Sequence, residues 1–182
     1  MKRILALILV FIMLLAECSC ASAASATKKS NSSKPNRPSA IPIASAVASS
    51  ELIENGLRYR AEQAVDGKIS TCWVEGASGY GEGQTITLYL DGIHNVSKIS
   101  IAAGWTINDQ LFYKNARPKT LYVYFSSLPY EHYEVKLDNT MSVQSIDVDE
   151  RNVSWVRFEL GDVYKGEKGV YDTCISEITL YE

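Results

Sequence analysis

The stretch Ala64-Val65-Asp66-Gly67-Lys68-Ile69-Ser70-Thr71-Cys72-Trp73-Val74-Glu75-Gly76 decides how the rest of the chain can be interpreted. Asp66-Gly67 is typical of a turn, because glycine accepts a positive φ and aspartate hydrogen-bonds the backbone that follows it. The Asp66 carboxylate and the Ser70 and Thr71 hydroxyls are hard oxygen donors. Hard oxygens on a rigid loop suit Ca²⁺, which takes about six to eight of them. The alternative is a plain Asx turn that ends in a buried Trp73.

A second stretch, Asp172-Thr173-Cys174-Ile175-Ser176-Glu177-Ile178-Thr179-Leu180, is typical of a loop that runs into a last strand. It contains Cys174 and Glu177, and the first stretch contains Cys72. If the two cysteines are bonded, Glu177 comes to lie beside the Asp66 loop. One site would then be assembled from opposite ends of the domain.

The pattern A-x-D-G-x-x-x-T-x-W at residues 64–73, followed by I-S-E-I at residues 175–178, resembles the coagulation factor V/VIII type C (discoidin) domain. The resemblance is closer to the bacterial form found as the glycan-binding translocation domain of NAD-glycohydrolase. Trp73-Val74-Glu75-Gly76, residues 113–119 and residues 162–178 carry it, in the same order. It implies an all-β fold: an eight-stranded antiparallel β-sandwich, a jelly roll of the galactose-binding-domain-like type.

The resemblance also implies a structural Ca²⁺ site that pins the first loop to the last strand. Its ligands would be the side chains of Asp66, Thr71 and Glu177 and the carbonyl oxygens of Gln63, Lys68 and Ser176. Two carboxylates at such close range repel each other unless a cation neutralises them. The chain departs from the family at Cys72 and Cys174, where small residues such as Ala are expected, which supports a cysteine pair added to the common scaffold.

The N-terminus predicts export. Residues 1–26 combine Lys2 and Arg3 with a short apolar run and small residues at two cleavage positions, as a signal peptide does. The run is shorter than the about 20 residues that span a membrane, so no transmembrane segment is expected in the mature chain. Lipid anchoring through Cys18 or Cys20 is the alternative. Residues 27–42 are predicted to be a disordered polar linker, and residues 43–182 the sandwich domain.

Composition and periodicity agree with a secreted all-β domain. The net charge of −3 argues against a nucleic-acid partner, for which a basic stripe would be expected. Apolar and polar residues alternate in short stretches bounded by turn residues, among them one around Ile86 and another around Ile99, which predicts separate strands with one wet face. After signal cleavage Cys72 and Cys174 are the only cysteines, and in an oxidising compartment they would form one disulfide. Two free thiols are the alternative.

Loops are the expected place for a binding face, because the strands are committed to the core. Sugar recognition calls for an aromatic platform and a few fixed polar groups. For Trp73 the alternative is a core anchor, and for Arg117 it is a salt bridge to a loop carboxylate that holds the loops in shape. The predicted ligand-binding residues are Trp73, Glu75, Trp105, Tyr113, Asn115, Arg117, Tyr164 and Asp172, with Asp109, Lys165, Lys168 and Tyr171 in the same loops.

Catalysis has little support. A nucleophile needs a nearby base, and neither His94 nor His132 has a recognisable partner. Glu75 and Asp172 could be arranged as a glycosidase pair, but no spacing requires it. The sequence therefore predicts a secreted, non-catalytic carbohydrate-binding module that acts at a cell surface or matrix. A protein-interaction module that docks a secreted or envelope partner through the same loops is the alternative.

Overall fold

The computed structural model describes residues 38–182, so the predicted signal peptide, Cys18, Cys20 and most of the predicted linker lie outside the described residues. The last residues of that linker belong to the folded domain. Ile41 is buried, and its N–H donates to the Leu180 carbonyl at 2.8 Å. Among the described residues, no helix has the length and apolar character to cross a membrane.

The described chain is mostly strand, and its strands pair antiparallel. Two short helices are the exceptions: the 3-10 helix η1 and the α-helix α1. The elements in chain order are β1 (Ile43–Ala48), β2 (Ile53–Glu54), β3 (Leu57–Arg58), η1 (Ala61–Ala64), β4 (Trp73–Val74), β5 (Thr85–Ala103), α1 (Asp109–Lys114), β6 (Arg117–Pro118), β7 (Thr120–Phe125), β8 (Leu128–Lys136), β9 (Gln144–Leu160), β10 (Val163–Tyr164) and β11 (Cys174–Tyr181).

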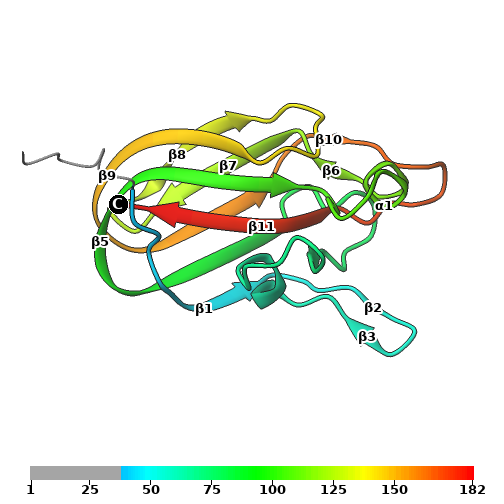
Figure 1. The fold of residues 1–182 in the computed structure, drawn as a ribbon, viewed down its shortest axis with the longest axis horizontal. Coiled ribbons are helices and arrows are strands. Elements are labelled where there is room, and N and C mark those ends of the chain that lie inside the picture. Colours follow the sequence, from blue (N-terminus) through cyan, green and yellow to red (C-terminus); the bar gives the residue numbers. More distant parts are fainter. Residues whose placement is uncertain (1–37) are drawn as a thin grey trace, which may run out of the picture. The chain divides into compact units, whose positions relative to one another are not determined.

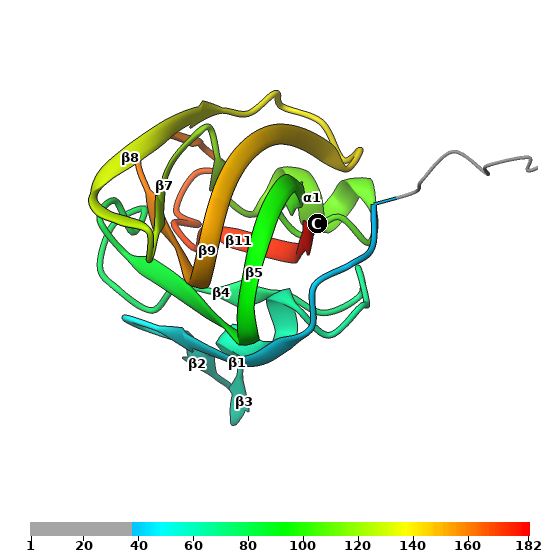
Figure 2. The ribbon, with the colours of Figure 1, turned by 90° about the vertical axis from the view of Figure 1, so that its left-hand side faces the viewer.

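The long strands β5 and β9 join the two layers of the sandwich. The first part of β5 pairs with β1 and with the end of β9, and its last part pairs with β11 and with the start of β9. Register shifts between Tyr89 and Lys98 mark the bend where both strands curve from one layer to the other (Figure 2). The stretches around Ile86 and Ile99, which the alternation predicts as separate strands, are therefore two arms of β5.

The predicted all-β antiparallel sandwich is confirmed. In β5, β7, β9 and β11, alternate residues over much of each strand point into one core, as the period of two requires. On facing positions, Ile86 pairs with Phe158 and Leu88 with Val156, and all four side chains are buried.

The elements that surround the candidate site gather at one end of the domain. Figure 1 shows α1, β6, β10 and the β2–β3 hairpin at the end away from the C-terminus. Helix α1 begins after Asn108, whose Oδ1 accepts the Leu111 N–H at 2.8 Å and so caps the first turn. β11 runs from this end to the C-terminus, beside the second part of β5.

Candidate functional site

The Asp66 loop has the geometry that the sequence predicts. Gly67 has a φ of 77°, a conformation that glycine adopts readily. The Thr71 hydroxyl lies 2.9 and 3.0 Å from the two Asp66 oxygens and 3.0 Å from the Lys68 carbonyl oxygen. Glu177 reaches the same loop from β11 and accepts the Gly67 N–H at 3.0 Å. Three predicted side chains and one predicted carbonyl therefore converge.

The electrostatics of this cluster fit a cation. Glu177 is half-buried, and burial raises the pKa of its carboxyl to about 7, with a further contribution from the charge of Asp66. Among residues 38–182 no three His, Cys, Asp or Glu side chains form a metal-binding group. A metal here would depend on hydroxyl and carbonyl oxygens in addition to the two carboxylates, and such a donor set suits Ca²⁺.

Gln63 and Ser176 have side chains that are engaged elsewhere. The Gln63 Oε1 accepts the Arg60 N–H at 2.7 Å. The Ser176 hydroxyl donates to the Gly104 carbonyl at 2.8 Å and accepts the Thr106 N–H at 3.0 Å. The predicted metal ligands of these two residues are their backbone carbonyl oxygens, and that role stays a prediction.

The two cysteines are buried neighbours. Cys72 and Cys174 are free thiols in the structure and pack together with Val74 in a small cluster of their own. A hydrogen bond to Cys72 and burial both raise the pKa of the Cys174 thiol well above its usual value. Tyr59 and Trp105 pack on this cluster, so the thiols lie beneath two aromatic side chains of the pocket described below.

Trp73 and Glu75 are not surface residues, and the prediction that they bind a ligand is corrected. Trp73 is fully buried in the main core, and its indole N–H donates to the Ser50 carbonyl at 3.0 Å. Glu75 is 1% exposed, and its carboxylate accepts the N–H groups of Ala77 at 2.7 Å and Thr173 at 3.4 Å. Trp73 is therefore a core anchor, and Glu75 ties two loops together.

Arg117 is also an interior residue, 5% exposed. Its Nε donates to Asn139 Oδ1 at 2.7 Å, and its guanidinium lies 4.7 Å from the centre of the Phe112 ring. One terminal nitrogen donates to the Asn115 carbonyl at 3.0 Å. Arg117 does not line the pocket described below. It holds the loops in shape, although through an amide, carbonyls and a ring, without the expected carboxylate.

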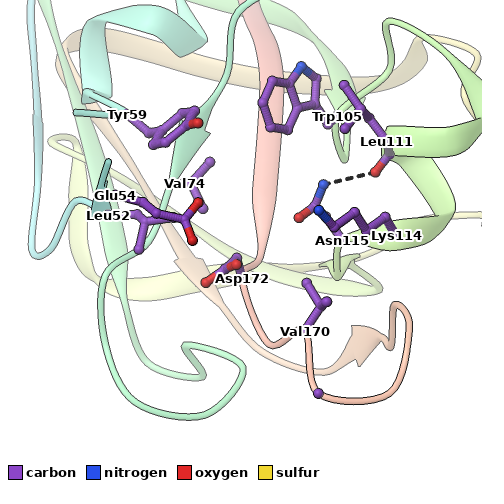
Figure 3. Close-up of a pocket in the computed structure, with 11 residues that line it drawn as sticks. Leu52, Glu54, Tyr59, Val74, Trp105, Leu111, Lys114, Asn115, Val170 and Asp172 are labelled. Carbon is purple, nitrogen blue, oxygen red and sulfur yellow. Dashed lines mark hydrogen bonds between the residues drawn. The ribbon is translucent and has the colours of Figure 1, made fainter. Parts of the chain in front are cut away.

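A pocket of about 340 Å³ lies between the β2–β3 hairpin, α1 and the loop before β11 (Figure 3). Three predicted ligand-binding residues line it: Trp105, Asn115 and Asp172. Tyr59 meets Trp105 edge to face, with ring centres 5.7 Å apart. The full lining is Leu52, Glu54, Tyr59, Val74, Trp105, Leu111, Lys114, Asn115, Gly169, Val170 and Asp172.

The β2–β3 hairpin contributes Glu54 to the pocket, and Tyr59 follows it, although neither is among the predicted site residues. Its turn is Asn55-Gly56, and both residues have positive φ angles, 50° and 77°. An Asn-Gly pair between apolar residues is a strong hairpin signal, and it could have placed Glu54 and Tyr59 on a projecting loop. Backbone hydrogen bonds from Leu52 to Val74 and from Tyr59 to Leu52 hold the hairpin beside β4.

The other predicted ligand-binding residues lie outside this pocket. Tyr113 is 55% exposed and packs on Phe112 with ring centres 5.1 Å apart. The Tyr164 hydroxyl donates to the Leu137 carbonyl at 3.0 Å. The remaining loop residues are exposed and do not line the pocket; they are Asp109, Lys165, Lys168 and Tyr171.

Comparison with known proteins agrees with this architecture. A search of curated protein sequences finds no match. A family 32 carbohydrate-binding module from Clostridium perfringens, solved with GalNAc-β-1,3-galactose, is 20% identical, with a TM-score of 0.62 over 79% of this chain and 100% of that chain. The family 32 module of C. perfringens NanJ, solved with galactose, is 21% identical, with a TM-score of 0.60 over 79% and 98%.

A third solved structure, the family 32 module of AlyQ in complex with 4,5-unsaturated mannuronic acid, is 18% identical, with a TM-score of 0.56 over 79% of this chain and 98% of that one. At these identities the likeness concerns the fold. The resemblance read from the loop motifs is confirmed by sequence, because the family model described as the NAD glycohydrolase translocation F5/8 type C domain matches residues 39–181. The chain therefore belongs to the family of NAD glycohydrolase translocation F5/8 type C domains.

Proposed function

We propose that this protein is a secreted, non-catalytic carbohydrate-binding module that holds a sugar in the pocket between the β2–β3 hairpin, α1 and the loop before β11. The observation that carries the proposal is the pocket itself, where Tyr59 and Trp105 stand beside the polar groups of Asn115 and Asp172 (Figure 3). Aromatic rings offer apolar surface to a sugar ring, and a few fixed polar groups orient its hydroxyls.

Two links in the scaffold would support the pocket: a Ca²⁺ ion at the Asp66 loop and a disulfide between Cys72 and Cys174. Ca²⁺ held by Asp66, Thr71, Glu177 and nearby carbonyls would neutralise two carboxylates and pin the first loop to β11. A Cys72–Cys174 disulfide would tie the residue before β4 to the first residue of β11, beneath Tyr59 and Trp105. Both links would keep the walls of the pocket rigid, which lowers the entropy lost on binding.

Replacing Trp105 by alanine should weaken sugar binding by about tenfold, because the pocket loses an aromatic wall. A glycan array with the purified protein would identify bound sugars, starting with galactose and GalNAc, which the solved relatives bind. Calorimetry with the best sugar then measures the change. Tyr130→Ala is the control, because Tyr130 is 96% exposed and lies outside the pocket. Equal affinity for both variants would contradict the proposed location.

A protein partner is the second candidate, favoured by two apolar side chains on the hairpin beside the pocket. Ile53 is 67% exposed and Leu57 is 61% exposed. Apolar side chains that project from a rigid loop can anchor a protein interface.

Removing the surface glycans of a target cell enzymatically separates the two candidates. Sugar binding predicts that the protein no longer attaches after this treatment and that an I53S/L57S variant attaches normally to untreated cells. A protein partner predicts the opposite on both counts, with attachment measured by flow cytometry.

A further inference from the structure

The proposed sugar pocket has carboxylate and amide oxygens on two sides, beside the donors of Lys114, Tyr59 and Trp105. The carboxylates of Glu54 and Asp172 line one side of it, and Asn115 lies opposite (Figure 3). Among residues 38–182, neither Glu54 nor Asp172 has an ion-pair partner within 4.0 Å. Their charges are therefore available to a bound molecule.

Asn115 adds a third acceptor. Its side chain is fixed, because the residue is 6% exposed and its amide nitrogen donates to the Leu111 carbonyl at 2.9 Å. Because the amide nitrogen is bonded to the helix backbone, Oδ1 faces the pocket (Figure 3). Within the described chain no protein donor reaches this oxygen.

The pocket is acidic. Burial raises the pKa of the Asp172 carboxyl, and the neighbouring charge of Glu54 raises it further, whereas Lys114 lowers it. Two carboxylates and one ammonium leave the lining with a net charge of −1 when all three are ionised, and no other charged residue lines the cavity. Like charges that share a site favour a ligand that brings a cation to them.

We propose that the pocket recognises an amine-bearing sugar, a hexose whose 2-amino group is not acetylated. The inference rests on the proposed function and names its ligand class. A protonated amine has three N–H donors and no acceptor, which matches the Glu54, Asp172 and Asn115 oxygens. The Tyr59 and Trp105 rings would cover the apolar part of the sugar. N-acetylation removes the charge, so an acetylated sugar would lose the ionic contribution.

Calorimetry at about pH 6 tests the proposal with matched sugars: glucosamine and galactosamine, each against its N-acetyl form, and galactose. The wild-type protein should bind the free amines about tenfold more tightly than the acetylated forms, because charge-assisted hydrogen bonds are the stronger ones. Glu54→Gln and Asp172→Asn should each remove most of that preference, so that the free amine and its acetylated form bind with similar affinity. Glu167→Gln, an exposed acid of the same loop that does not line the pocket, should keep it.

The outcomes distinguish the amine proposal from the proposed glycan-binding function. If galactose or an acetylated sugar binds as tightly as the free amine, the amine proposal is overturned and the glycan-binding function stands. If no sugar binds, both are overturned. Binding of a lysine-containing peptide in place of every sugar would likewise overturn both. Circular dichroism of each variant checks that a lost preference does not come from a lost fold.

Discussion

Oxidation of the Cys72–Cys174 pair should raise the free energy of unfolding by up to about 4.7 kcal/mol over the reduced protein, because the bond closes a loop of about 100 residues in the unfolded chain. The thiols already pack together, so the bond needs little rearrangement of the fold. The midpoint of thermal unfolding should rise by roughly 10 °C. In the reaction with oxidised glutathione, each cysteine thiol gives up a proton. The glutathione disulfide takes up the two electrons and two protons and is released as two glutathione thiols.

Peptide mapping identifies the bond, and thermal melts with and without reductant measure its effect. A C72S/C174S variant should melt at the same temperature in both conditions, which controls for effects of the reductant elsewhere. Finding both cysteines alkylated after secretion, or equal melting of oxidised and reduced protein, would contradict the prediction.

The same burial predicts when the bond forms. A thiolate is the reactive species in disulfide exchange, and the raised pKa of Cys174 keeps its thiol neutral. The folded, reduced protein should therefore react slowly with oxidised glutathione, and the unfolded chain quickly. Oxidation would belong to folding in the exporting compartment.

The strands and the Asp66 loop could be predicted from the sequence because their signals are local. Alternation places Ile86 and Leu88 on one face whatever the rest of the chain does. Asp66-Gly67 makes its turn through a local bond between side chain and backbone, since the Lys68 N–H donates to Asp66 Oδ1 at 2.9 Å. Glu177 is far away in sequence, and only the family resemblance indicates it; it accepts the Gly67 N–H, and its role as a metal ligand stays a prediction.

The pocket was only partly predictable, because residue type does not say which way a loop side chain points. Trp73, Glu75 and Arg117 have the chemistry of sugar-binding residues, but their positions turn them into the core. Arg117 lies on β6, where pairing with β10 leaves it beneath α1 and against Phe112. Tyr59 reaches the pocket only through a hairpin that long-range bonds hold beside β4.

Ca²⁺ bound at the Asp66 loop should stabilise the folded protein. Saturating Ca²⁺, at about 100 times its dissociation constant, should add about 2.7 kcal/mol to the free energy of unfolding at pH 8, and a chelator should remove this gain. Glu177→Gln should abolish most of it, because the ion loses one of its two carboxylates. Glu62→Gln is the matched control, an exposed acid on η1 that is no predicted ligand. Thermal melts with Ca²⁺ and with chelator measure each effect.

The pH dependence gives a second readout with a defined sign. The pKa of Glu177 is about 7 in the folded protein and 4.5 ordinarily, so between these values the folded state holds a proton that the unfolded state has released. Without metal, stability should therefore fall as pH rises from about 4.5 to 7 and then level off. Ca²⁺ needs the ionised carboxylate, so its stabilising effect should grow over the same range. A Ca²⁺ effect equal at pH 5 and pH 8, or absent at both, would remove Glu177 from the site.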